Sequence, residues 1–89
     1  MTSLRRSSKV EEAPLQQELL LFDPASSRFF LLNQTMAFVW RHGEGKSPDA
    51  LVAELAGAFE GAEESLVRED VEKAVSELES LGLVRLDSA

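Results

Sequence analysis

Two apolar runs joined by a turn-forming segment constrain the fold of this chain more than any other feature. The first run is Leu19-Leu20-Leu21-Phe22, the second is Arg28–Leu32, and Asp23-Pro24-Ala25-Ser26-Ser27 lies between them. Short apolar runs on either side of a Pro-, Ser- and Asp-containing segment are typical of a β-hairpin with a loop of about four or five residues. The sequence therefore predicts antiparallel strands at residues 18–22 and 28–32.

The remaining chain predicts one more strand and three helices. A short strand is expected within residues 10–16, with Pro14 at its end or on an outer edge, because proline cannot donate to a ladder. With 89 residues the chain is one domain. The predicted fold class is α+β, a three-stranded antiparallel sheet followed by three helices. The domain is assigned to residues 10–89.

Start and stop signals delimit the three helices. Asn33 or Thr35 can cap the first helix, and the glycines after His42 end it. Ser47-Pro48-Asp49 starts the second, since Ser caps, Pro fits the first helical position and an acid suits the first turn. The third runs from near Ser65 to residue 81, where a glycine follows. Residues 83–86 are either a short strand or a docked tail.

The N-terminal nine residues differ in charge from the rest. They hold Arg5, Arg6 and Lys9 and no acid, whereas the other 80 residues carry six cations against sixteen acids, a net charge of −10. Their Ser and Thr content and lack of periodicity predict a disordered tail at residues 1–9.

The second strand of the hairpin is apolar on both faces. Because side chains alternate, Phe30 faces one side while Phe29 and Leu31 face the other. One side must pack on the helices. For the other, two interpretations are open: residues 8–17 fold over it, or it stays exposed for a partner. In the second case Phe29, Leu31 and Leu20 predict a homodimer contact.

The same strand is predicted to lie at the edge of its sheet, because no obvious later segment can pair with its outer side. An edge strand offers unpaired backbone N–H and C=O groups, and with a helix beside it the edge suits an extended peptide. Asp70, on the third helix, could bind the backbone or a cationic side chain of such a peptide. Its alternative roles are an exposed acid or an ion-pair partner of Lys73.

Composition argues against several other functions. The chain contains no cysteine and one histidine, His42, so a zinc site is implausible and no cofactor is expected. No catalytic constellation is found, and the segment at Gly43–Ser47 lacks the spacing of a phosphate loop. We expect a protein that is not an enzyme. No membrane span or secretory signal is visible, which favours the cytoplasm.

The main rival is a winged-helix DNA-binding protein, since the third helix occupies the place of a recognition helix. Its charge argues against nucleic acid. Residues 63–81 hold seven acids against Arg68 and Lys73, and such a helix is repelled by phosphates.

Several segments resemble the PqqD-like proteins, also called RiPP precursor peptide recognition elements. Their order and spacing carry the resemblance, which covers about residues 10–86. The matching segments are Phe30-Leu31-Leu32-Asn33, Ala37-Phe38-Val39-Trp40, the helix start from Ser47 to Leu55, Asp70-Val71 with Val75 and Leu78, and Gly82-Leu83-Val84.

The resemblance implies a winged-helix-like domain that binds the leader of a ribosomally made precursor peptide and presents it to a modifying enzyme, often a radical SAM enzyme. It implies that the leader adds to the third strand and lies toward the third helix. A small residue, Ala74, stands where a bulkier one is common in the family, which would widen the groove. The implied peptide-binding residues are Arg28, Phe29, Phe30, Leu31, Leu32, Val67, Asp70, Val71 and Ala74.

Overall fold

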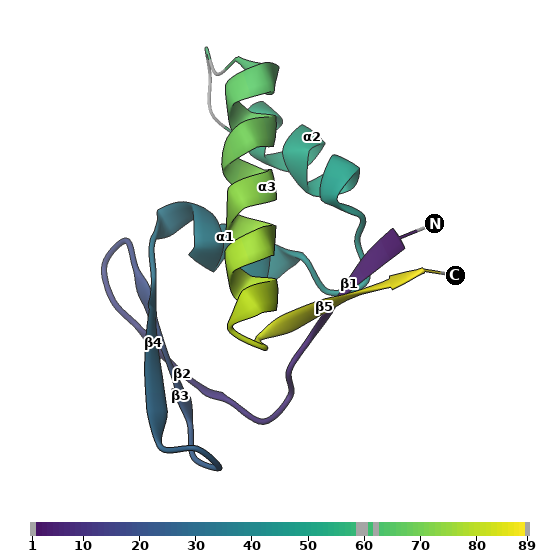
Figure 1. Ribbon diagram of the computed structural model, residues 1–89. Coiled ribbons are helices and arrows are strands. Elements are labelled where there is room, and N and C mark those ends of the chain that lie inside the picture. Colours follow the sequence, from purple (N-terminus) through teal and green to yellow (C-terminus); the bar gives the residue numbers. More distant parts are fainter. Residues whose placement is uncertain (1, 59–60, 62, 89) are drawn as a thin grey trace.

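The computed structural model describes residues 2–58, 61 and 63–88, and its chain folds into strands and helices arranged as in Figure 1. The α+β, winged-helix-like fold class is confirmed. The elements in chain order are β1 (Thr2–Arg6), β2 (Glu11–Pro14), β3 (Leu19–Asp23), β4 (Arg28–Leu32), α1 (Gln34–His42), α2 (Pro48–Ala58), α3 (Glu64–Ser80) and β5 (Val84–Ser88).

The predicted hairpin is confirmed and supplies the central strand, β3, and one edge strand, β4, of a three-stranded antiparallel sheet. The strand order is β2-β3-β4, so β2 is the predicted first strand. Asp23 lies opposite Arg28 at the end of the hairpin. Its carboxylate accepts hydrogen bonds from the Ala25 N–H and the Ser26 hydroxyl, both at 3.0 Å. These bonds satisfy loop donors and hold the turn closed.

A second, two-stranded sheet joins the ends of the chain. β1 pairs antiparallel with β5, so the prediction of a disordered segment at residues 1–9 is wrong over Thr2–Arg6, and the C-terminal segment is a strand. Leu4 explains the order, because its side chain is 1% exposed in the core. Its N–H also donates to the Lys46 carbonyl, and its carbonyl accepts from the Gly45 N–H, both at 2.8 Å.

Figure 1 shows this sheet and the hairpin on opposite sides of the end of α3.

The helix boundaries follow the predicted signals. The Asn33 side chain accepts from the Met36 N–H at 2.9 Å and caps α1. The Ser47 hydroxyl accepts from the Ala50 N–H at 3.2 Å, and Pro48 is the first residue of α2. Gly82 has a φ of +76°, as expected of the left-handed residue that follows α3.

The core lies between the inner face of the hairpin sheet, the three helices and the β1–β5 pair. α3 contributes most, packing against α1, α2 and β5. Trp40, the single tryptophan, is 2% exposed and lies in this core. Among the described residues, no helix is long and apolar enough to cross a membrane. The apolar residues with almost no exposure are Leu4, Leu19, Leu21, Leu32, Val39, Trp40, Leu51, Val52, Val71 and Leu78.

Candidate functional site

β4 is an edge strand. Within the part of the chain that the structure describes, it pairs with β3 on one side and with no strand on the other. β5, the later strand, belongs to the second sheet and does not reach it. The sequence-based prediction of an open edge at Arg28–Leu32 is therefore confirmed.

The turn between β2 and β3 fixes which backbone groups of β3 face each neighbour. The Leu15 N–H donates to the Glu18 carbonyl at 3.0 Å, so these residues form a hydrogen-bonded pair. The next pair, Pro14 opposite Leu19, must be a non-hydrogen-bonded one, in keeping with the missing N–H of proline. The polar groups of Leu19 therefore point away from β2 and toward β4.

This alternation continues across the hairpin. Leu19 lies opposite Leu32, so the polar groups of Leu32 and, two residues earlier, of Phe30 point toward β3. Those of Phe29 and Leu31 must then point to the open side. The edge thus presents two N–H and two C=O groups that no strand of the described chain takes up.

The side chains of β4 divide between two faces. Phe30 and Leu32 are buried on the inner face, whereas Phe29 is 65% exposed and Leu31 57% exposed on the outer one. Phe22 adds to the outer face, with its ring centroid 4.6 Å from that of Phe29. β2 extends the sheet sideways and all its residues are exposed. The interpretation in which residues 8–17 cover this face is therefore wrong.

A groove lies between α3 and the start of α1, which directly follows β4. It holds a cavity of about 230 Å³, and Asp70 and Ala74 of α3 face the start of α1 across it. Ala74 is 4% exposed and forms part of the wall, so its small size leaves the groove open. The residues lining this groove are Asn33, Thr35, Met36, Asp70, Lys73, Ala74 and Glu77.

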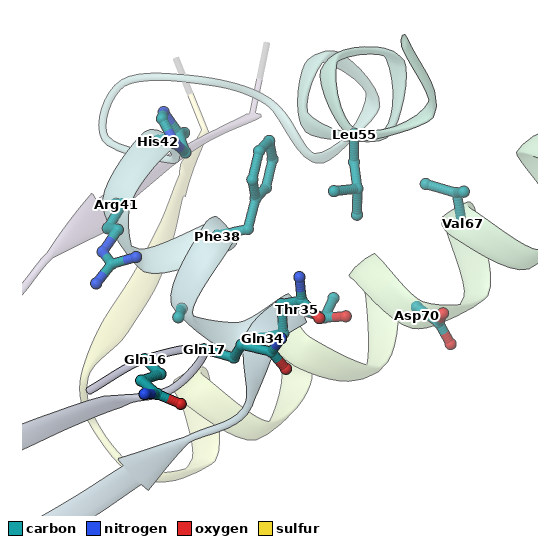
Figure 2. Close-up of a pocket in the computed structure, with 11 residues that line it drawn as sticks. Gln16, Gln17, Gln34, Thr35, Phe38, Arg41, His42, Leu55, Val67 and Asp70 are labelled. Carbon is teal, nitrogen blue, oxygen red and sulfur yellow. The ribbon is translucent and has the colours of Figure 1, made fainter. Parts of the chain in front are cut away.

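A second cavity of about 330 Å³ lies between α1, α2 and α3 (Figure 2). Asp70 and Thr35 line it as well as the groove, and it also includes Val67. Sequence reasoning missed this cavity. No local sequence pattern indicates it, because its lining comes from α1, α2, α3 and the turn between β2 and β3. Its lining is Gln16, Gln17, Gln34, Thr35, Ala37, Phe38, Arg41, His42, Leu55, Val67 and Asp70.

Of the residues that the resemblance implies, Val67, Asp70 and Ala74 line the groove or the second cavity. Phe30 and Leu32 of β4 are buried in the core and line neither space. Arg28 lies at the start of the open edge, its guanidinium 4.9 Å from the ring centre of Phe30. Val71 is fully buried in the core and lines neither the groove nor the second cavity. Its contribution to the site is to hold α3 against the core.

The ion pairs on α3 leave Asp70 available. Lys73 lies 3.8 Å from Glu69, one turn earlier, so the interpretation of Asp70 as the partner of Lys73 is wrong. Arg68 contacts Asp49 at 2.6 Å, and this hydrogen bond raises the pKa of the Arg68 guanidinium above its ordinary value. Among the described residues, Asp70 forms no ion pair. A carboxylate without a partner at the groove can accept hydrogen bonds from a guest.

The described residues contain no group of three or more His, Asp or Glu side chains placed to hold a metal ion. His42 is exposed at the end of α1, with its ring centroid 4.6 Å from that of Phe38. The site is thus built from backbone groups, apolar walls and a few isolated polar side chains.

The fold and the open edge define a winged-helix-like domain with a groove suited to an extended chain. The chain belongs to the PqqD family: the family described as coenzyme PQQ synthesis protein D matches residues 18–84. A comparison with curated proteins finds no relative.

Two solved structures share this fold. The structure of TbiB1 in complex with the TbiA(beta) leader peptide aligns with a TM-score of 0.76 and 21% identity, covering 91% of this chain and 94% of that one. The structure of lasso peptide synthetase B1 complexed with the leader peptide aligns with a TM-score of 0.74 and 25% identity, covering 93% and 98%. Both neighbours were solved with a leader peptide bound.

Proposed function

We propose that this protein captures the leader segment of a ribosomally synthesised precursor peptide by adding it as a strand to β4. The observation that carries the proposal is the row of outward-facing backbone groups on Phe29 and Leu31, beside the groove along α3. Two proteins of the same fold bind leader peptides, which supports it.

Strand addition divides recognition into two parts. Main-chain pairing with β4 gives affinity with little dependence on sequence, while the groove selects alternate side chains of the guest. In this proposal Arg28–Leu32 supply the ladder, and Val67, Asp70 and Ala74 line the path of the guest. Val71 backs this wall from the core.

We further propose that the protein acts as a cytoplasmic adaptor rather than as an enzyme. It would hold the leader while a separate modifying enzyme, such as a radical SAM maturase, acts on the rest of the precursor. The composition of the site supports this role, because backbone groups and apolar walls bind a chain but do not transfer protons or groups.

The proposal is tested with peptides made from the short open reading frames that neighbour the gene of this protein. Each peptide is titrated into the protein by calorimetry. An interface of at most about 1,200 Å² that is anchored by one or two apolar side chains gives micromolar affinity or better. We expect one peptide to bind in this range, and failure of every neighbouring peptide to bind would contradict the proposal.

Reversing the charge of Asp70 is expected to weaken leader binding about five-fold, or about 1 kcal/mol. Asp70 lines the groove without an ion-pair partner in the described chain, so Asp70→Lys removes an acceptor and repels a cationic leader side chain. Calorimetry measures the change. Glu72→Lys is the matched control, since Glu72 is exposed on α3 and lines neither the groove nor the second cavity. Equal affinities for the two variants would show that Asp70 is only a solvated acid.

The homodimer remains a prediction, favoured by the uncovered outer face. Phe29 and Leu31 are exposed there beside the half-buried Leu20 and Phe22. Sedimentation velocity over a range of concentrations is expected to show a rising sedimentation coefficient. The double variant Phe29→Ser, Leu31→Ser should remain monomeric, and a wild-type protein that is monomeric throughout would contradict the prediction.

A further inference from the structure

A third hollow, the basic groove, lies beside the β1–β5 sheet, away from the leader site. It is lined by residues 5–9, Glu44, Glu79 and residues 82–85, and its volume is about 690 Å³. None of these residues belongs to β4 or lines the groove along α3 or the second cavity. A leader bound at β4 therefore leaves the basic groove open to a different guest.

Cations are concentrated in the basic groove. Four of the nine Lys and Arg residues of the chain line it, against two acids, although the whole chain carries a net charge of −7. The groove is thus a positive region on an acidic protein, and it attracts anions that the acidic faces of the chain repel. Its charged residues are Arg5, Arg6, Lys9, Arg85, Glu44 and Glu79.

Two of these cations are held close together at a cost. Arg5 lies directly opposite Arg85 in the β1–β5 pair, where like charges repel. Asp87 offsets part of the repulsion, because its carboxylate lies 3.6 Å from Arg5 and 3.2 Å from Arg85. Arg5 also contacts Glu44 at 3.6 Å. The Arg85 side chain nevertheless remains 75% exposed, so it is accessible to a guest.

Arg6 and Lys9 form no ion pair within the part of the chain that the structure describes. The Arg6 guanidinium is fixed in place: its Nη1 donates to the Trp40 carbonyl at 3.0 Å, and its carbon lies 5.1 Å from the centre of the Trp40 ring. Since Trp40 is buried, Arg6 loses little side-chain freedom when a carboxylate binds its remaining N–H groups. Ser8 is exposed between the two cations and adds a hydroxyl donor.

We propose that the basic groove docks an acidic segment of the modifying enzyme. Guanidinium, ammonium and hydroxyl groups all donate to carboxylates, and the bonds from the charged donors are the strong ones. Charge complementarity of this kind orients two proteins and speeds their encounter. This inference rests on the proposed adaptor role, to which it adds a docking surface and the chemistry of the partner.

The position of the basic groove favours the enzyme as its occupant. Antiparallel pairing is the more stable arrangement, and in it the leader runs opposite to β4, so the rest of the precursor leaves at the Arg28 end. Figure 1 shows the turn between β3 and β4 and the segment between β1 and β2 at the same, lower end of the molecule. An enzyme docked in the basic groove would therefore lie at the end where the segment to be modified emerges.

The first probe is a fluorescein-labelled 12-residue peptide of alternating Glu and Ser, titrated at about 50 mM salt and followed by anisotropy. The wild-type protein should bind it, and the double variant Lys9→Glu, Arg85→Glu should bind at least about ten-fold more weakly. Both positions are exposed. Absence of wild-type binding overturns the inference, and so does tighter binding of a 12-nucleotide single-stranded DNA, which would assign the groove to nucleic acid.

The double variant Lys46→Glu, Arg68→Glu is the matched control. It makes the same change in net charge at positions outside the basic groove, the groove along α3 and the second cavity. Its affinity for the acidic peptide should stay within about three-fold of the wild type. Equal losses in the two double variants would mean that only net charge acts, and would overturn the inference. Trp40 fluorescence checks folding, and if the groove variant unfolds, Lys9→Glu alone decides.

The second probe is the modifying enzyme encoded beside the gene of this protein, titrated into the protein saturated with leader. Its affinity should fall at least about ten-fold in the groove variant and stay within about three-fold in the control. Leader affinity should be unchanged in both. Enzyme binding that the groove variant leaves intact overturns the docking surface but not leader binding. A wild-type protein that binds no leader overturns the adaptor role, and this inference with it.

Discussion

Leu31→Pro is expected to weaken leader binding at least about 30-fold while the domain stays folded. Proline removes the N–H that Leu31 directs to the open side of β4, and its ring obstructs the approach of a guest strand. Loss of two ladder hydrogen bonds at about 1 kcal/mol each accounts for that factor. The β3–β4 ladder should survive, because Leu31 occupies a non-hydrogen-bonded position opposite Leu20.

Leu31→Thr separates the backbone effect from the side-chain effect. It removes the same leucine, whose side chain is 57% exposed on the outer face, and retains the N–H. We expect this variant to bind the leader with nearly wild-type affinity in calorimetry. Weak binding by Leu31→Thr would mean that the outer-face side chain, and not the strand edge, binds the guest.

The adjacent position shows why the choice of residue matters. Phe30 directs its polar groups toward β3 and is 7% exposed. From the sequence alone, Phe30 is an attractive target for a proline substitution. A proline at this position would remove both an N–H donor of the β3–β4 ladder and a side chain of the core. We therefore expect Phe30→Pro to unfold the domain, which makes it unsuitable as a test of binding.

Filling the groove is the second change with a large expected effect. Ala74→Arg should reduce leader affinity at least about ten-fold, because the long side chain would occupy the space of about 230 Å³ between α3 and the start of α1. Acidic neighbours, Asp70 and Glu77, would hold the guanidinium in the groove. The measurement is calorimetric titration, with the melting temperature followed by Trp40 fluorescence.

Ser76→Arg is the matched control for this variant. It introduces the same side chain and the same change in net charge on α3, at an exposed position that lines neither the groove nor the second cavity. We expect its affinity to remain within about two-fold of the wild type. If both arginine variants lose affinity equally, the effect is one of overall charge, and the groove is not the path of the guest.

Local sequence signals were sufficient to predict the hairpin and the helices. The turn at residues 23–27 is closed by the Asp23 side chain, and the caps at Asn33 and Ser47 make the hydrogen bonds that their residue types suggested. Each of these features depends on residues within five positions of one another. The open edge followed from the order of the elements.

Features that depend on distant residues were not predictable from local patterns. β1 is ordered because Leu4 enters the core and because β5, about 80 residues away, pairs with it. The polar residues around Leu4 give no indication that this segment pairs with β5. The second cavity likewise forms only where Phe38, Leu55 and Val67 meet from three helices. The burial of Val71 depends on how α3 is rotated against the core.

The most direct measurement of strand addition is amide hydrogen exchange, resolved by residue with NMR, in the free protein and with saturating leader peptide. Phe29 and Leu31 carry the N–H groups that face the open side, whereas Phe30 is already paired with β3. We predict that exchange at Phe29 and Leu31 is fast in the free protein and slows at least about ten-fold when the peptide binds. Unchanged exchange at both residues in a fully bound sample would show that the guest binds elsewhere.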